Sequence, residues 1–265
     1  MKFLALIGSL VLGLVAILRS AVEEAGHVVI LLAQSVTWLF RPPFRLREIV
    51  RQLDFVGSQS VILIGFTGAF TGMVSALQAY TAVHRYGTES VIGGIVVLAL
   101  ARELGPVISA LMIIARVGSA MTAELGSMRN TQQIDALTAM AVEPVQYLVA
   151  PRVVAAVIAS PLLALLFSFC GMVGAYVVAT AYLGVDEGTF MAGVRDFLEV
   201  GDITHGLIKS VFFGLLMSLV ACYKGFYVTG GARGVGIATT EAVVASSVLV
   251  LISDYVMTNM MFHPS

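Results

Sequence analysis

Residues 116–144, RVGSAMTAELGSMRNTQQIDALTAMAVEP, form the longest polar segment of a chain whose other long segments are mostly apolar. Charged side chains are spread along it, and residues 130–133 add one Asn, one Thr and two Gln. Unpaired polar groups are costly in hydrocarbon, so a polar segment between membrane spans lies in water or against a partner. This segment, called the polar island below, therefore predicts the organisation of the chain around it.

The composition is that of a membrane protein. Of 265 residues, 58% are hydrophobic and 12% are charged, whereas soluble domains carry about 25% charged residues. Long apolar segments cross bilayers as α-helices. We therefore expect an all-α polytopic membrane protein, with residues 1–265 forming one transmembrane domain.

Several function classes find no support in the composition. The net charge of -1 gives no sign of a nucleic-acid partner. The four histidines are scattered without metal-ligand spacing, so no metal site is expected, and Cys170 and Cys222 lie in apolar segments as small fillers. No Ser/His/Asp or HExxH arrangement is present, so we expect no catalytic residues and no enzyme.

Five spans are expected, at roughly residues 55–83, 91–114, 152–180, 207–226 and 242–262. Residues 55–265 form this five-span core. Residues 1–54 are expected to form a helical segment at the membrane interface, followed by a basic connector. The alternative for residues 1–40 is a sixth span.

Basic residues predict the orientation. The connector contains Arg41, Arg45, Arg47 and Arg51, and the polar island adds two further arginines, whereas Arg85 and Arg195 alone fall on the opposite side. Cytoplasmic loops carry the excess of Lys and Arg. The connector and the island are therefore expected in the cytoplasm, and the C-terminus outside.

A charged pair interrupts the second span. Arg102 and Glu103 lie in its middle, shortly before Pro106, while Lys209 lies near the outer end of the fourth span and Asp254 inside the last. Charged groups in a span are costly unless they are paired or reach water. Two interpretations stay open: a structural ion pair that joins helices, or a polar patch in a substrate cavity.

Glycines predict close helix packing. Gly65, Gly68 and Gly72 lie nearly on one face of the first span, and Gly68 and Gly72 form a small-xxx-small pair. Gly171 and Gly174 give the third span a similar face. We expect helix packing, and a dimer contact, at Gly65, Gly68 and Gly72.

The polar island is rich in helix formers, with Pro144 at its end. Ile134, Leu137, Met140 and Ala141 form one apolar face, so we expect an amphipathic helix between spans two and three that docks a partner. The alternative is a solvated loop. No G-x-x-x-x-G-K-[ST] motif occurs in the sequence, so an ATP-driven mechanism requires a separate ATPase.

The run ARELGPVISALMIIARVGSAMTAELGSMRNTQQIDALTAMAVEPVQYLVAPRVVA at 101–155 closely resembles the MlaE/YrbE permease family of ABC lipid transporters. GMVSALQAY at 72–80, LIKSVFF at 207–213 and the last span extend the similarity over most of the chain.

The resemblance implies a homodimeric permease of the Gram-negative inner membrane that has an interfacial N-terminal helix and five spans. It also implies an ATPase partner (MlaF) that binds the ATP and Mg, so that this chain itself holds no cofactor. The other implied partners are a STAS-domain protein (MlaB) and a hexameric MCE protein (MlaD) on the periplasmic side.

Site residues follow from the same resemblance. Phospholipid is expected in an outward-open cavity between the two subunits, near Tyr86, Arg102, Glu103 and Lys209. The family's coupling element matches the polar island, and its candidate ATPase contacts are Glu124, Arg129, Gln132, Gln133 and Asp135.

The main alternative function is an ion-coupled secondary transporter that uses Arg102, Glu103 and Asp254 as a proton relay. Transporters of that kind are often built from internal repeats, which we do not find across the spans. A structural platform for periplasmic partners is a weaker alternative.

Overall fold

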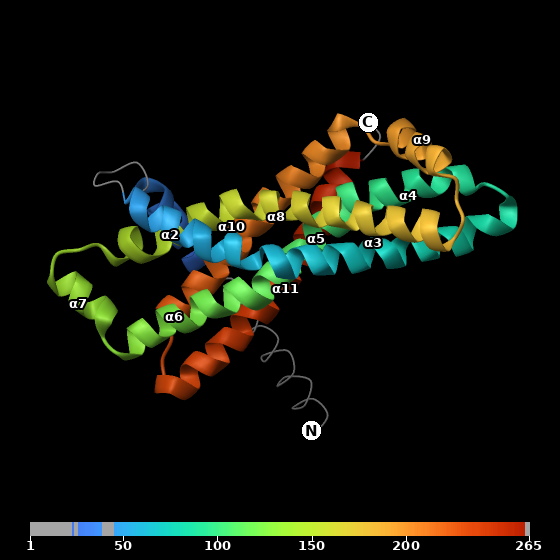
Figure 1. Ribbon diagram of the computed structural model, residues 1–265. Coiled ribbons are helices and arrows are strands. Elements are labelled where there is room, and N and C mark those ends of the chain that lie inside the picture. Colours follow the sequence, from blue (N-terminus) through green and yellow to red (C-terminus); the bar gives the residue numbers. More distant parts are fainter. Residues whose placement is uncertain (1–22, 24–25, 39–44, 263–265) are drawn as a thin grey trace, which may run out of the picture.

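The computed structural model describes residues 23, 26–38 and 45–262, and these residues form helices and connecting turns, with no strand among them (Figure 1). Besides the helix Gly26–Trp38, the elements in chain order are α2 (Leu46–Val56), η1 (Ser58–Ser60), α3 (Val61–Val83), η2 (His84–Tyr86), η3 (Glu89–Val91), α4 (Ile92–Ala99), η4 (Leu100–Leu104), α5 (Gly105–Ile113), η5 (Ile114–Gly118), α6 (Ser119–Asn130), α7 (Gln133–Ala139), η6 (Val145–Val149), α8 (Ala150–Val177), η7 (Val178–Tyr182), α9 (Glu187–Phe197), α10 (Val200–Phe226) and α11 (Gly231–Phe262).

Five helical segments are long and apolar enough to cross a membrane, which confirms the predicted all-α polytopic fold. They are Leu46–Tyr86, Glu89–Asn130, Val145–Tyr182, Val200–Phe226 and Gly231–Met261. The first three combine several of the elements above. Figure 1 shows them running side by side, with α7 near one end of the molecule and α9 near the other.

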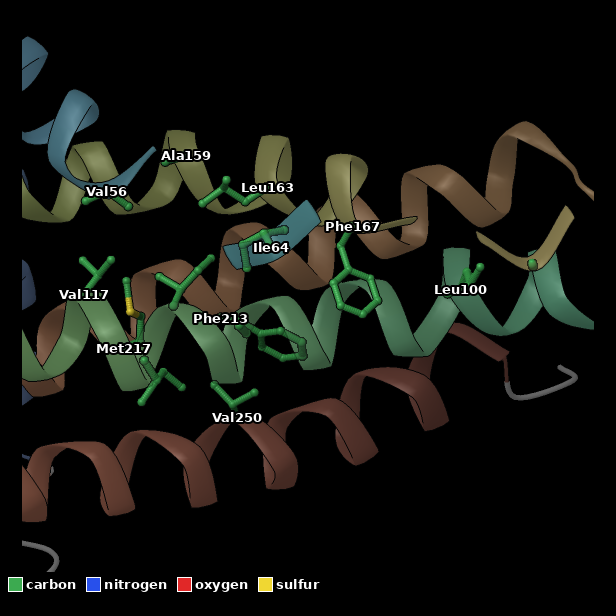
Figure 2. Close-up of a cluster of buried hydrophobic side chains, with 14 of the residues drawn as sticks. Val56, Ile64, Leu100, Val117, Ala159, Leu163, Phe167, Phe213, Met217 and Val250 are labelled. Atoms are coloured by element: carbon green, nitrogen blue, oxygen red, sulfur yellow. The ribbon is translucent and has the colours of Figure 1, made fainter. Parts of the chain in front are cut away.

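The spans pack around a shared apolar core. Ile64, Phe167, Phe213 and Val250 are almost fully buried and come from four different spans (Figure 2). A second buried cluster lies beneath α7, where Leu31 of the helix Gly26–Trp38 packs with other apolar side chains. Gly26–Trp38 is shorter than the roughly 20 residues that a span requires. The rest of the N-terminal segment predicted to be interfacial lies outside the described residues.

The predicted glycine packing occurs within the chain. A Cβ atom on Gly68 would lie 2.5 Å from the carbonyl oxygen of Phe167, and one on Gly72 would clash with the carbonyl of Gly171. Gly68 and Gly72 therefore let α3 approach the backbone of α8 closely. At Gly65 a Cβ would only make ordinary contact with Cys170 Sγ, at 3.7 Å. The helix packing predicted at Gly68 and Gly72 is therefore made with α8 of the same chain.

A short helix, α7, lies between spans two and three as predicted, but it takes up only part of the polar island. The first part of the island continues the second span without a break as η5 and α6, up to Asn130. The chain then turns at Gln132, whose φ of 59° is left-handed, and only the short α7 follows. Met140 is 65% exposed, and Met140 and Ala141 lie beyond α7, so the predicted apolar face is reduced to Ile134 and Leu137.

Two segments outside the expected spans, residues 181–206 and 227–241, are largely helical. α11 begins at Gly231, well before the predicted residue 242, and α10 begins at Val200 rather than 207. A capping box explains the start of α10, because Glu199 and Asp202 each accept a hydrogen bond from the other's backbone amide. The acidic loop before it contains α9, capped by Asp186, which accepts from the Thr189 amide at 2.9 Å.

Candidate functional site

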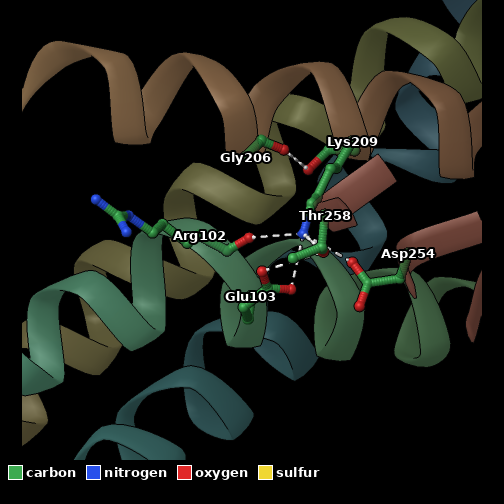
Figure 3. A network of polar contacts seen from close by, with 7 residues as sticks. Arg102, Glu103, Gly206, Lys209, Asp254 and Thr258 are labelled. Atoms are coloured by element: carbon green, nitrogen blue, oxygen red, sulfur yellow. Dashed lines mark hydrogen bonds and ion pairs between the residues drawn. The ribbon is translucent and has the colours of Figure 1, made fainter. Parts of the chain in front are cut away.

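Lys209 is the centre of a buried polar cluster that joins three spans (Figure 3). Its side chain lies on α10 and is fully buried. The ammonium Nζ donates to Glu103 Oε2 at 2.7 Å, to Asp254 Oδ1 at 2.9 Å and to Thr258 Oγ1 at 2.7 Å. These bonds link η4, α10 and α11.

Pro106 helps to explain why Lys209 reaches this point. In a regular helix the amide of residue 106 would bond to the carbonyl of Arg102, but proline has no N–H. Lys209 Nζ lies 3.3 Å from that carbonyl oxygen. The helix also widens here into a π-helical turn, η4. Gly206 lets α10 approach closely, because a Cβ there would clash with the Ala101 carbonyl.

Arg102 and Glu103 do not form the main ion pair with each other. Arg102 contacts Asp202 instead, with Nε and Nη2 each 2.7 Å from Oδ1. Asp202 is buried and also accepts from the Glu199 amide at 3.1 Å through Oδ2. The same carboxylate therefore caps α10 and ties it to η4, which supports the interpretation of ion pairs that join helices.

Asp202 and Thr258 are members of the cluster that sequence reasoning missed. Asp202 lies before residue 207, where the fourth span was expected to begin, and Thr258 is an uncharged residue of the last span. Helical spacing could have identified both: Asp202 precedes Lys209 by two turns, and Thr258 follows Asp254 by four residues, so each pair shares a helix face.

The charges of the cluster are unevenly exposed. Two cations face three carboxylates, of Glu103, Asp202 and Asp254. The side chain of Arg102 is 36% exposed and that of Glu103 38%, whereas that of Lys209 is 0%. An anionic group arriving from outside can therefore reach Arg102, while Lys209 would first have to give up one of its present partners.

Tyr86 belongs to a different part of the molecule from this cluster. It lies on η2, at the end of α3, and is 80% exposed. The cluster is built from η4, α10 and α11, so these described contacts do not bring Tyr86 together with Arg102, Glu103 and Lys209.

The candidate coupling residues form the corner between α6 and α7. Arg129 Nη1 lies 2.6 Å from Asp135 Oδ1, and both side chains are well exposed. Gln133 Nε2 donates to Thr131 Oγ1 at 3.0 Å, next to the left-handed Gln132. The sequence-predicted residues from 129 to 135 are thus brought together in one exposed turn.

Glu124 has an internal partner. Its Oε2 lies 2.8 Å from Nη2 of Arg152, which is almost fully buried at the start of α8 and also donates to the Leu148 carbonyl at 2.6 Å. Farther into the bundle along the same continuous helix, Arg116 donates to Ser60 Oγ at 2.7 Å. These contacts tie the segment that ends at the corner to the neighbouring spans.

In the part of the chain that the structure describes, no group of His, Cys, Asp and Glu could hold a metal ion.

Comparison with known proteins finds matches that cover most of the chain. The family described as "Permease MlaE" matches residues 49–260. A probable ABC transporter permease protein of Rickettsia felis is 42% identical over 240 residues, which cover 91% of this chain and 93% of that protein.

Two further relatives have more specific names. The intermembrane phospholipid transport system permease protein MlaE of Haemophilus influenzae is 39% identical over 215 residues, covering 81% of this chain and 82% of that protein. The chloroplastic protein TRIGALACTOSYLDIACYLGLYCEROL 1 of Arabidopsis thaliana is 36% identical over 236 residues, covering 89% and 67% of the two chains.

Proposed function

Because this chain belongs to the MlaE permease family, we propose that it is the membrane subunit of an ABC transporter that moves phospholipid between the bacterial inner membrane and a periplasmic carrier. The observation that carries this proposal is the 39% identity to a phospholipid transport permease over most of both chains. The chain itself is non-catalytic, and a separate ATPase of the MlaF type binds ATP and Mg. The same system includes a STAS-domain protein (MlaB) and a hexameric MCE protein (MlaD).

In this proposal the α6–α7 corner lies in the cytoplasm and α9 in the periplasm. α2, which contains Arg47 and Arg51, lies toward the α7 end in Figure 1, as does the end of α6, which contains Arg129. The segment around α9 is acidic, and this difference agrees with the positive-inside rule. The C-terminus is then periplasmic.

The ATPase docks on the α6–α7 corner. Arg129, Gln132, Gln133 and Asp135 present polar groups there, and Glu124 and Arg152 connect the corner to α8. Because α6 continues the second span, a displacement of the corner is transmitted along one helix towards Arg102 and Glu103.

Phospholipid binds in a cavity between two copies of the chain. Arg102 offers a partly exposed guanidinium for the phosphate, Glu103 lies beside it, and Tyr86 lies at the outer mouth. Lys209 is buried beneath this surface, where its contacts with Glu103 and Asp254 hold α10 against η4 and α11.

Reconstitution tests the function and its main alternative. We expect labelled phospholipid to leave proteoliposomes for a soluble acceptor only when the ATPase subunit and ATP are present. Transport that needs a proton gradient and no ATPase would instead support the ion-coupled transporter that uses Arg102, Glu103 and Asp254. A chain variant unable to bind the ATPase serves as the negative control.

A further inference from the structure

An apolar cavity of about 260 Å³ lies within one subunit, between α8, α9, α10 and the second span. It is separate from the polar cluster around Lys209, which contributes none of its lining. From α8 it receives a stripe of side chains at helical spacing, which includes Leu165, Ser168 and Phe169. α9 contributes Val194 from the far side.

The chemistry of the wall excludes ordered water. The polar side chain in the wall, Ser168, already donates its hydroxyl to the Leu100 carbonyl at 3.0 Å. A buried water needs about two to four polar partners. The cavity therefore suits an apolar occupant.

The cavity opens towards the surface that faces lipid. Leu165 is 41% exposed and Phe169 68% exposed on a helix that crosses the bilayer. The medium at this mouth is hydrocarbon. A transmembrane helix of a partner, about 10 Å wide, does not fit a space of this volume, whereas part of a single extended hydrocarbon chain does.

We propose that this cavity holds one acyl chain of a phospholipid from the surrounding bilayer, at a site complete within a single subunit. Ala101 and Ile203 line the cavity, and their chain neighbours Arg102 and Asp202 form the ion pair described above. This ion pair joins the second span to α10 within one chain, so the wall of the cavity does not depend on a second subunit.

Fluorescence quenching by brominated lipid tests the proposal. Trp38 is the one tryptophan of the chain, so a Trp38→Phe background has no tryptophan fluorescence. Phe169→Trp places a probe in the cavity. Leu162→Trp is the matched control, because it continues the same face of α8, is 61% exposed and lies outside the cavity.

In bilayers of phospholipid with brominated acyl chains, both probes are quenched. After transfer into detergent and extensive washing, we expect quenching to persist for Phe169→Trp and to be lost for Leu162→Trp. Equal recovery of fluorescence by both tryptophan probes would mean that only exchangeable lipid of the surrounding bilayer touches this face, which would overturn the proposal. An unquenched Phe169→Trp in the bilayer would also overturn it.

Two substitutions from different helices fill the space. Ala164→Leu from α8 and Val194→Phe from α9 should each abolish the retained quenching. Two cavity-filling variants are used so that the test remains possible if one of them misfolds. A monodisperse profile in size-exclusion chromatography identifies folded protein. Retained quenching in both folded variants would contradict the proposal. The site requires only that the chain spans a bilayer, so these outcomes are independent of ATP-driven transport.

Discussion

At the scale of residues, Lys209 has the most demanding environment in the described part of the chain. Its ammonium is fully buried, and it is stabilised only because Glu103, Asp254 and Thr258 surround it. Removal of one partner from a buried ion pair leaves an uncompensated charge, which is far more costly than loss of the pair as a whole.

We therefore predict that Lys209→Met destabilises the protein by about 3 kcal/mol or more. Thermal unfolding in detergent, followed by size-exclusion chromatography, measures the loss. The triple variant Lys209→Met, Glu103→Gln, Asp254→Asn removes the orphaned charges and should recover much of the stability. If the single and triple variants melt at the same temperature, the cluster does not stabilise the fold in this way.

Much of this cluster could be predicted from the residues. Arg102, Glu103, Lys209 and Asp254 stand out because charges are rare inside spans. Their pairing could not be predicted, because it depends on which faces of three helices meet. Asp202 was missed for a related reason: the fourth span was expected to begin at residue 207, although Asp202 lies in the first turn of α10.

At the scale of elements, the ion pair between Arg129 and Asp135 at the α6–α7 corner can have either of two roles. Arg129 and Asp135 contact each other at 2.6 Å, so each can act by holding the corner or by touching the ATPase directly. Both side chains are exposed, and exposed pairs contribute little to global stability.

We predict that Arg129→Asp weakens co-purification of the ATPase without loss of membrane insertion, because two carboxylates then repel each other at the corner. The double variant Arg129→Asp, Asp135→Arg restores the pair with reversed signs. If it restores ATPase binding, the pair acts by holding the corner. If it does not, the individual side chains contact the ATPase. Normal binding by Arg129→Asp alone would contradict the proposed docking site.

The contact between α3 and α8 gives a second prediction at this scale. Gly72→Ala places a methyl group against the Gly171 carbonyl, so we expect a loss of about 1–3 kcal/mol through overpacking. Gly65→Ala is the matched control on the same helix, where a Cβ makes only ordinary contact. Thermal unfolding of both variants compares them, and equal melting temperatures would mean that α3 shifts without cost.

The cap of α9 predicts a pH dependence. Hydrogen bonds from the Thr189 amide and hydroxyl lower the pKa of Asp186 below its usual value. A carboxylate with a lowered folded-state pKa stabilises the fold above the unfolded pKa, and this stabilisation disappears as the pH falls through the folded value.

We therefore expect hydrogen-exchange protection in the first turn of α9 to fall below about pH 4, after correction for intrinsic exchange rates. Asp186→Asn keeps an acceptor at the cap but does not titrate, so its protection should not change over the same range. A parallel loss of protection in wild type and variant would assign the effect to another group.

At the scale of the whole molecule, the number of spans was predictable and the helix ends were less so. Apolar length alone identifies the five crossings. The ends depend on local hydrogen bonds: Glu199 and Asp202 extend α10, and Gln132 stops α6 through a left-handed turn that residues other than glycine rarely adopt. The short helix between the spans could therefore be predicted, whereas the continuation of the second span through residues 116–130 of the polar island could not.

The orientation of the chain in the membrane is a property of the whole molecule, because it depends on the charged residues at both ends of the helix bundle. Gln133 on α7 and Glu187 on α9 lie at opposite ends of the bundle. In a background without Cys170 and Cys222, single cysteines at these two positions report the side on which each end lies. We expect an impermeant thiol reagent added to spheroplasts to label Glu187→Cys and to leave Gln133→Cys unmodified until the membrane is opened. Arginines on the side of α7 favour this outcome because they hold that side in the cytoplasm. Labelling of Gln133→Cys in intact spheroplasts would reverse the topology and remove the α6–α7 corner from the reach of any cytoplasmic ATPase.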